Sequence, residues 1–202
     1  NQGEEAVSVI DIQSGAAIAS IPVGSEPYGL TFGGANQSRL YVANTNGNTV
    51  SVIDTATRQV IATVPTGLKP YYAAAAASRV FVTNGQSNTV TVIDTATNSA
   101  VATIPVGAYP RGIKAHGNEL YVANYGDPFY YSGGNTVSVI DAASAQVTAT
   151  VILPAGSRGP RGVTVLGDRV YVSNYLTNNV SVIDTATKTV IATIPVGAGP
   201  RG

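Results

Sequence analysis

The chain has 202 residues, 11 lysines and arginines against 11 aspartates and glutamates, and a formal net charge of zero at pH 7. This balance gives no excess of positive charge for binding nucleic acid, and the lack of cysteine excludes disulfides, thiol catalysis and cysteine-ligated metals. With a single histidine and no apolar run long enough to cross a bilayer, we expect no metal site, no cofactor and no membrane span.

Internal repeats organise the whole chain. The aspartate of a recurring Val-Ile-Asp falls at 11, 54, 94, 141 and 184, in steps of 43, 40, 47 and 43 residues. Each unit holds four short stretches of alternating, β-branched or aromatic residues between turn residues, which predicts four strands. In one unit the predicted strands are Gly112–Ala115, Leu120–Asn124, Thr136–Asp141 and Gln146–Val151. The alanine run 73–77 stands where other units have a first strand, so it is predicted as strand despite its helix propensity.

Counting strands along the chain predicts an all-β propeller of four-stranded antiparallel blades, with four full blades and two strands of a partial blade. Asn1 stands ten residues before Asp11, as Asn44 stands before Asp54, so the chain opens on the third strand of a unit. It ends at Gly202, where a first strand should begin, and it contains no methionine. We therefore expect residues 1–202 to be one propeller domain, part of a longer propeller. Two alternatives are a five-bladed ring that lacks about eleven residues and a partial blade completed by a second chain.

Several short motifs recur in these units. They are "YVAN" at Tyr41 and Tyr121, "FVTN" at Phe81, "YVSN" at Tyr171, the core "VSVIDTAT" and "ATIPVG". The sequence resembles the YVTN β-propeller repeats of prokaryotic surface and periplasmic proteins. The resemblance implies a propeller fold and an extracellular, cell-surface or periplasmic location. It implies no single activity, because members of that family do not share one. The aspartate of "VIDTAT" is interpreted as a turn residue whose carboxylate caps backbone N–H groups, with calcium binding as the alternative.

One rim of the propeller should gather the side chains that bind ligands. Because adjacent strands are antiparallel, the blade-to-blade loops and the loops between second and third strands lie on the same rim. The residue after the proline of each blade-to-blade loop is, in turn, Tyr28, Tyr71, Arg111, Arg161 and Arg201. These residues predict an anion site at the mouth of the central channel, since guanidinium groups bind carboxylate or phosphate. The alternative is that each arginine packs on a tyrosine and bonds to backbone carbonyls, sealing the channel.

An insertion of seven residues distinguishes one unit: Asn124 and Asp141 are seventeen residues apart, where other units have ten. The following blade-to-blade loop is three residues longer than its counterparts. Together they predict a surface that recognises a protein or a glycan, because aromatic rings supply rigid contact area. Its residues are Tyr125, Asp127, Phe129, Tyr130, Tyr131 and Arg158. The alternative is a loop that only covers a blade edge.

The leading functional prediction is an extracytoplasmic binding or scaffold module that recognises a protein, a glycan or a small anion on this rim. The alternative is an enzyme, or the propeller subunit of one, such as a quinoprotein-type dehydrogenase or a lyase with its site at the channel mouth. Binding is favoured because the acidic residues are mostly turn aspartates, and no catalytic residue is assigned. Lys114 and His116 share one predicted first strand. One interpretation is that they form a catalytic pair. The alternative is that the histidine is a hydrogen-bonded residue of the channel wall.

Overall fold

The computed structural model describes residues 1–127 and 132–201, and their side chains except at 127, 132 and 133. The described residues form eighteen strands, two short 3-10 turns at Gln2–Glu4 (η1) and Ala35–Gln37 (η2), and no helix long and apolar enough to cross a membrane. The strands are β1 Ala6–Ile10, β2 Ala17–Pro22, β3 Pro27–Gly33, β4 Arg39–Asn44, β5 Thr49–Asp54, β6 Gln59–Pro65, β7 Pro70–Ala76, β8 Arg79–Asn84, β9 Thr89–Asp94, β10 Ser99–Pro105, β11 Pro110–His116, β12 Glu119–Asp127, β13 Ser132–Asp141, β14 Gln146–Ile152, β15 Pro160–Leu166, β16 Arg169–Asn174, β17 Asn179–Asp184 and β18 Val190–Pro195.

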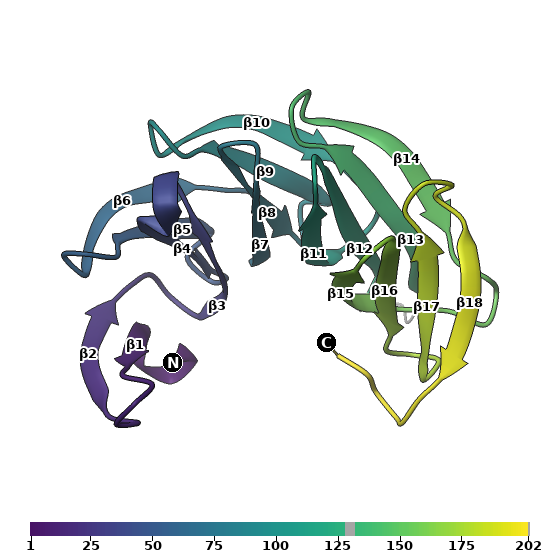
Figure 1. The fold of residues 1–202 in the computed structure, drawn as a ribbon, viewed down its shortest axis with the longest axis horizontal. Coiled ribbons are helices and arrows are strands. Elements are labelled where there is room, and N and C mark those ends of the chain that lie inside the picture. The colour runs from purple at the N-terminus through teal and green to yellow at the C-terminus, as the bar shows by residue number, and fades with distance from the viewer. Residues whose placement is uncertain (128–131, 202) are drawn as a thin grey trace.

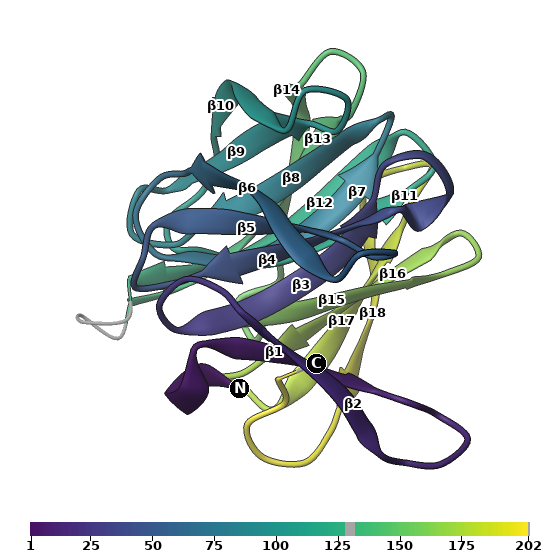
Figure 2. The same ribbon diagram turned by 90° about the vertical axis from the view of Figure 1, so that its left-hand side faces the viewer.

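Within the described residues the strands form four four-stranded antiparallel sheets and one two-stranded sheet, β1–β2. Strand order in each sheet follows the chain, so β3, β7, β11 and β15 are the first strands of their sheets. These four strands line the inner side of an arc, and the fourth strands lie on its outer side (Figure 1). The side view shows the sheets stacked behind one another (Figure 2). The all-β prediction and the four-stranded antiparallel sheets are confirmed.

The hydrophobic cores lie between neighbouring sheets. One cluster joins Tyr41 and Val50 of the β3–β6 sheet to Val80 and Ile93 of the next sheet, and all four side chains are buried. Further clusters repeat this arrangement between the other neighbouring sheets. In the three sheets that have a neighbour on each side, the second and third strands are therefore covered on both faces, which explains why "YVAN" and "VSVID" are apolar beyond simple alternation.

Residues 73–76 of the alanine run lie in strand β7, as the register predicted, whereas Ala77 lies in the turn that follows. Ala73 pairs with Val82 and Ala75 with Val80, and both alanines pack on the Tyr41 cluster of the preceding sheet. Ala74 packs with Phe81 in the next cluster. Packing between sheets therefore overrides the helix propensity of alanine.

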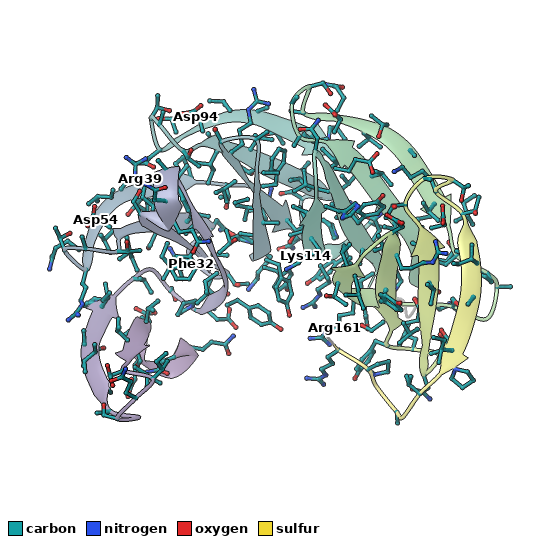
Figure 3. The ribbon with its side chains drawn as sticks, in the orientation of Figure 1. Phe32, Arg39, Asp54, Asp94, Lys114 and Arg161 are labelled. Atoms are coloured by element: carbon teal, nitrogen blue, oxygen red, sulfur yellow. The ribbon has the colours of Figure 1, made fainter. Side chains whose placement is uncertain are left out.

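The turn between the third and fourth strands is held by the repeated aspartate, as predicted. Asp54 Oδ1 accepts hydrogen bonds from the backbone N–H of Ala56 at 3.0 Å, the N–H of Thr57 at 2.8 Å and the Thr57 hydroxyl at 3.0 Å. Asp94 and Asp184 make the same three contacts. The backbone bond from Thr57 is the largest of the effects that lower the pKa of Asp54. Figure 3 places Asp54 and Asp94 toward the outer side of the arc.

In three of the four-stranded sheets, the residue that begins the second strand also bonds to the next sheet, in a contact called here the latch; Arg169, which begins β16, instead pairs with Asp184 of its own sheet. The Arg39 guanidinium donates to the Thr95 carbonyl and, at 3.0 Å, to Asn98 Oδ1 in the third-to-fourth-strand turn of the next sheet. Arg79 donates to the carbonyls of Ala142 and Ala143, at 3.1 and 2.9 Å, in the corresponding turn of the sheet after that.

The same latch has opposite polarity in the β11–β14 sheet. There Glu119 begins the second strand, and Lys188 of the next sheet donates to its carboxylate. Lys188 also donates to the Tyr121 hydroxyl at 3.0 Å. Between the β11–β14 and β15–β18 sheets, the second strand thus contributes an acidic residue instead of an arginine, and its partner in the next sheet is a lysine instead of backbone carbonyls.

The seven-residue insertion lengthens the hairpin between β12 and β13. Gly126 pairs with Gly133 and Asp127 with Ser132, beyond the pairs that the other units make, after a register shift that follows Asn124. The two strands therefore continue past the predicted ends at Asn124 and Thr136. Backbone pairing across the hairpin accounts for this extension.

Candidate functional site at the channel mouth

The two loop types that were expected to share one rim are hydrogen-bonded to each other. In four units, the residue after the "YVxN" asparagine donates its N–H to a carbonyl of the blade-to-blade loop. That carbonyl belongs to the residue before the proline of the loop, called here the motif proline. The pairs are Thr45 to Glu26 at 2.9 Å, Gly85 to Lys69 at 2.9 Å, Tyr125 to Tyr109 at 3.2 Å and Tyr175 to Gly159 at 2.9 Å. These bonds hold the two loops against each other at the rim of each four-stranded sheet.

The residue before each motif proline has a left-handed backbone. Its φ is 55° at Lys69, 50° at Tyr109 and 63° at Gly199. An asparagine side chain of the preceding second-to-third-strand loop accepts the N–H of each residue: Asn48 Oδ1 for Lys69 at 2.9 Å, Asn88 for Tyr109 at 2.8 Å and Asn178 for Gly199 at 2.9 Å. This conformation turns the chain sharply before the Tyr or Arg of the motif.

Glycines of the first strands let these strands approach closely at the mouth. A Cβ at Gly29 would stand 2.4 Å from the Tyr71 carbonyl oxygen, and one at Gly112 would stand 2.3 Å from the Arg161 carbonyl oxygen. No side chain fits at such distances. The residues just before these glycines, Tyr28 and Arg111, are thereby brought against the next sheet.

Six side chains make a closed circuit of contacts across the mouth. Tyr28 and Tyr71 meet edge to face with centroids 5.5 Å apart, and the Arg111 Cζ lies 4.0 Å from the Tyr71 centroid. Arg111 Cζ is 5.6 Å from the Tyr125 ring, which is 6.3 Å from the Tyr175 ring. Arg161 Cζ is 5.4 Å from Tyr175, and its Nη2 donates to the Tyr28 hydroxyl at 3.4 Å, which closes the circuit. We call this set the mouth ring: Tyr28, Tyr71, Arg111, Tyr125, Tyr175 and Arg161.

Three more side chains extend the mouth ring. Tyr72 packs edge to face on Tyr28 at 5.2 Å, and the Tyr109 hydroxyl is 3.0 Å from the Tyr71 hydroxyl. Arg201 Cζ is 5.5 Å from the Tyr175 centroid, so Tyr175 carries two guanidiniums. Figure 3 shows Arg161 on the inner side of the arc.

The electrostatics of the ring are positive. Although burial acts to raise it, the Tyr72 hydroxyl and the Arg161 guanidinium lower the pKa of Tyr28 below its ordinary value. Burial instead raises the pKa of Tyr71 and of Tyr72. Among the side chains that the structure describes, no carboxylate forms an ion pair with Arg111, Arg161 or Arg201.

The contacts of the arginines can be compared with the alternative in which they seal the channel. The packing of each arginine on a tyrosine is present, as the sealing alternative expected. The bonds to backbone carbonyls are absent among the described residues, and the Nε atoms of Arg111 and Arg161 are buried without a hydrogen-bond partner there. The donors that remain for a ligand are therefore the terminal nitrogens of these guanidiniums, of which Arg161 Nη2 also donates to the Tyr28 hydroxyl.

The residues predicted for a partner-binding surface separate into three groups. Tyr125 belongs to the mouth ring. Arg158 lies in the longer loop, where its N–H donates to Thr177 Oγ1 at 3.0 Å. Phe129, Tyr130, Tyr131 and the side chain of Asp127 lie outside the described part of the structure. The longer loop does adjoin the extended hairpin, because Gly159 N–H donates to the Gly134 carbonyl at 2.9 Å.

Lys114 and His116 do not join the mouth ring. Lys114 lies on the inner side of the arc (Figure 3), where it lines a cavity of about 750 Å³ together with Phe32 and the β7 alanines. Its ammonium makes no hydrogen bond or ion pair with any described side chain, and the described residues hold no group of three His, Cys, Asp or Glu suited to a metal. His116 stands at the end of β11, two residues beyond Lys114.

Sequence reasoning missed three tyrosines of the mouth: Tyr72, Tyr109 and Tyr175. Tyr175 had a usable signal, because it follows the "YVSN" asparagine as Tyr125 follows the "YVAN" asparagine. Tyr72 stands two residues after Pro70, where the other units have a glycine such as Gly29, and Tyr109 stands just before Pro110. Nothing in their spacing shows that they reach the same place as Arg111 or Tyr28.

No protein-family model and no curated protein sequence matches this chain. Among solved structures, it is similar to Kuenenia stuttgartiensis hydrazine synthase, with a TM-score of 0.74 and 24% identity over 89% of this chain and 52% of that chain. It is also similar to a chain in the crystal structure of a mitotic checkpoint complex, with a TM-score of 0.78 and 16% identity over 97% of this chain and 60% of that chain. Both neighbours are β-propellers, and at these identities the similarity shows the fold alone. This chain spans about half of the first and three fifths of the second.

Proposed function

We propose that the chain is part of an extracytoplasmic β-propeller of the YVTN repeat type that binds an anionic ligand at the channel mouth. The observation that carries this proposal is the mouth ring, where guanidiniums rest on tyrosine rings and no described carboxylate forms an ion pair with them. Guanidinium groups in such a setting bind oxyanions through charge-assisted hydrogen bonds. The location and the repeat family rest on the recurring "YVxN" and "VSVIDTAT" motifs.

Binding is proposed in preference to catalysis because of the chemistry at the mouth. Its side chains are guanidiniums and phenols, and the repeated aspartates lie in turns where they cap backbone N–H groups. Phenol and guanidinium supply hydrogen bonds and positive charge to a bound anion without a base–nucleophile pair. A dehydrogenase site at this mouth would need a cofactor to carry the hydride, and a lyase site would have to use a tyrosine phenol as its acid or base.

A titration with simple anions tests the proposal. Acetate, sulfate and inorganic phosphate would each be titrated into the protein while the tyrosine signals are followed by NMR. We expect shifts confined to the mouth tyrosines in wild type and their loss in an R111Q/R161Q double variant. Arg58→Gln is the matched control, because Arg58 is an exposed arginine in the turn between β5 and β6 on the opposite rim. Equal responses in the double variant and in R58Q would show that the mouth is not the site.

The extended hairpin supports a second binding role. Its strands β12 and β13 run nine and ten residues, against six for the second and third strands of the other sheets. We propose that it contacts a protein or glycan partner through the aromatic residues 129–131, as the sequence predicted. Deleting residues 127–133 should leave the melting temperature within a few degrees of wild type and abolish capture of that partner. Unchanged capture would refute this role.

A further inference from the structure

The three arginines of the mouth rest on two sets of tyrosine rings, called here the two patches, and Arg111 and Arg161 both act on the Tyr28 hydroxyl. Arg161 and Arg201 flank one ring, with Cζ atoms 5.4 and 5.5 Å from the Tyr175 centroid, so they lie at most about 11 Å apart. Arg111 packs on a different set of rings: its Cζ lies 4.0 Å from the Tyr71 centroid, 5.1 Å from the Tyr109 centroid and 5.6 Å from the Tyr125 centroid. The Tyr125 and Tyr175 rings, 6.3 Å apart, stand between the two patches.

Each patch favours an anion for its own reason. Arg161 and Arg201 carry like charges beside the same ring, and a bound anion offsets their repulsion. Arg111 lies against the Tyr71 ring with its Nε buried and unpartnered, so its two terminal nitrogens are the donors that remain for a ligand. These two donors match the two oxygens of a planar carboxylate.

The rim backbone argues against a phosphate site. Phosphate sites are commonly built from several free backbone N–H groups that converge on the anion. Here the rim N–H groups of Gly85, Tyr125 and Tyr175 are bonded to carbonyls of the blade-to-blade loops. Those of Lys69, Tyr109 and Gly199 are bonded to asparagine side chains. These six described N–H groups are therefore not available as a cradle of backbone donors, and the guanidiniums and tyrosine hydroxyls are the donors that the described mouth offers.

We propose that the ligand carries two separate carboxylates, one held by Arg111 and the other by Arg161 with Arg201, and that the tyrosines between the patches contact the body that joins them. This inference rests on the proposed function. Joining two weakly bound groups makes the second contact intramolecular, so affinity rises steeply when the spacing matches the two patches.

Calorimetric titration of the 202-residue chain with acetate, with straight-chain dicarboxylates of increasing length, and with inorganic phosphate tests the inference. We expect one dicarboxylate length to bind at least about 10-fold more tightly than acetate, within the gain that linked binding groups provide. R111Q and R161Q should each reduce that dicarboxylate to the affinity of acetate. R161K, which keeps the charge and loses the fork, should lose most of the gain, and R58Q should lose none. Thermal melts of each variant check that the sheets remain folded.

The outcomes separate the two proposals. If no anion binds, both the proposed function and this inference fail. If acetate binds and every dicarboxylate binds no better, the anion site stands and the two-carboxylate ligand is refuted. If inorganic phosphate binds as tightly as the best dicarboxylate, the inference is refuted in favour of a single multivalent oxyanion.

Discussion

The latch between Glu119 and Lys188 makes the sharpest prediction about how the sheets are held together. The two side chains come from β12 and from the turn before β18, and they are 31% and 23% exposed. Lys188 also donates to Tyr121 at 3.0 Å and to the Thr185 carbonyl. Substituting either charge leaves the other half-buried without its partner. Hydrogen bonds to charged groups contribute about 1.5–3 kcal/mol, and solvent screening at this exposure reduces that to about 1–2 kcal/mol.

A double-mutant cycle measures this contribution. E119Q, K188Q and the double variant would be unfolded with urea and followed by circular dichroism. We expect each single substitution to lower the free energy of unfolding by about 1–2 kcal/mol, and the double to cost less than their sum by about 0.5–1 kcal/mol. Lys114→Gln is the control, because Lys114 is exposed and bonds to no described side chain. Strict additivity in the cycle, or an equal loss in K114Q, would refute the latch.

The pH dependence of the same pair has a definite sign. Burial acts to lower the pKa of Lys188, but the hydrogen bonds to Glu119 and Tyr121 outweigh it and raise that pKa above its ordinary value. Stability from the pair is therefore fully present below the ordinary lysine pKa of about 10.4 and is lost as pH rises through the folded value. Wild type should lose stability above that pH more steeply than K188Q.

Three further predictions concern the first strands, the turns and the mouth. Gly112→Ala should cost at least about 1–3 kcal/mol through overpacking, because its Cβ would meet the Arg161 carbonyl oxygen at 2.3 Å; equal unfolding curves for G112A and G156A, whose Cβ meets nothing, would contradict this. The turn aspartates have lowered pKa values owing first to backbone hydrogen bonds, so their stabilisation is present above the ordinary aspartate pKa of about 3.9 and lost as pH falls through the lower folded values. D54A should therefore lose less stability on acidification than wild type, and parallel acid limbs would refute this. In an ultraviolet titration, Tyr28 should ionise before the buried Tyr71, because the Tyr72 hydroxyl and Arg161 lower the pKa of Tyr28 and burial raises that of Tyr71. Y28F should remove the first phase, and an unchanged first phase would show that the pKa of Tyr28 is not lowered.

The strands and their order could be predicted from sequence because their causes are local. Alternation between turn residues marks each strand, and a period of 40–47 residues places Asp54, Asp94 and Asp184 at equivalent turns. The capping bonds of those aspartates reach only two or three residues along the chain, so the motif "DTAT" contains both partners. The seven-residue insertion was visible as a break in the period, but its form as an extended hairpin depends on pairing across β12 and β13.

The mouth ring shows what only the tertiary structure decides. Position in the repeat placed Tyr28 and Arg161 on one rim, yet their contact joins residues 133 apart in sequence and depends on how far the arc carries β15 toward β3. Tyr175 enters the ring because two guanidiniums from successive units converge on it. Repeats specify each sheet through short-range pattern, whereas contacts between sheets depend on twist, loop conformation and the close approach permitted at Gly29 and Gly112. The amino-acid sequence by itself therefore determined the blades and their turns, and tertiary packing decided which of their side chains meet at the mouth.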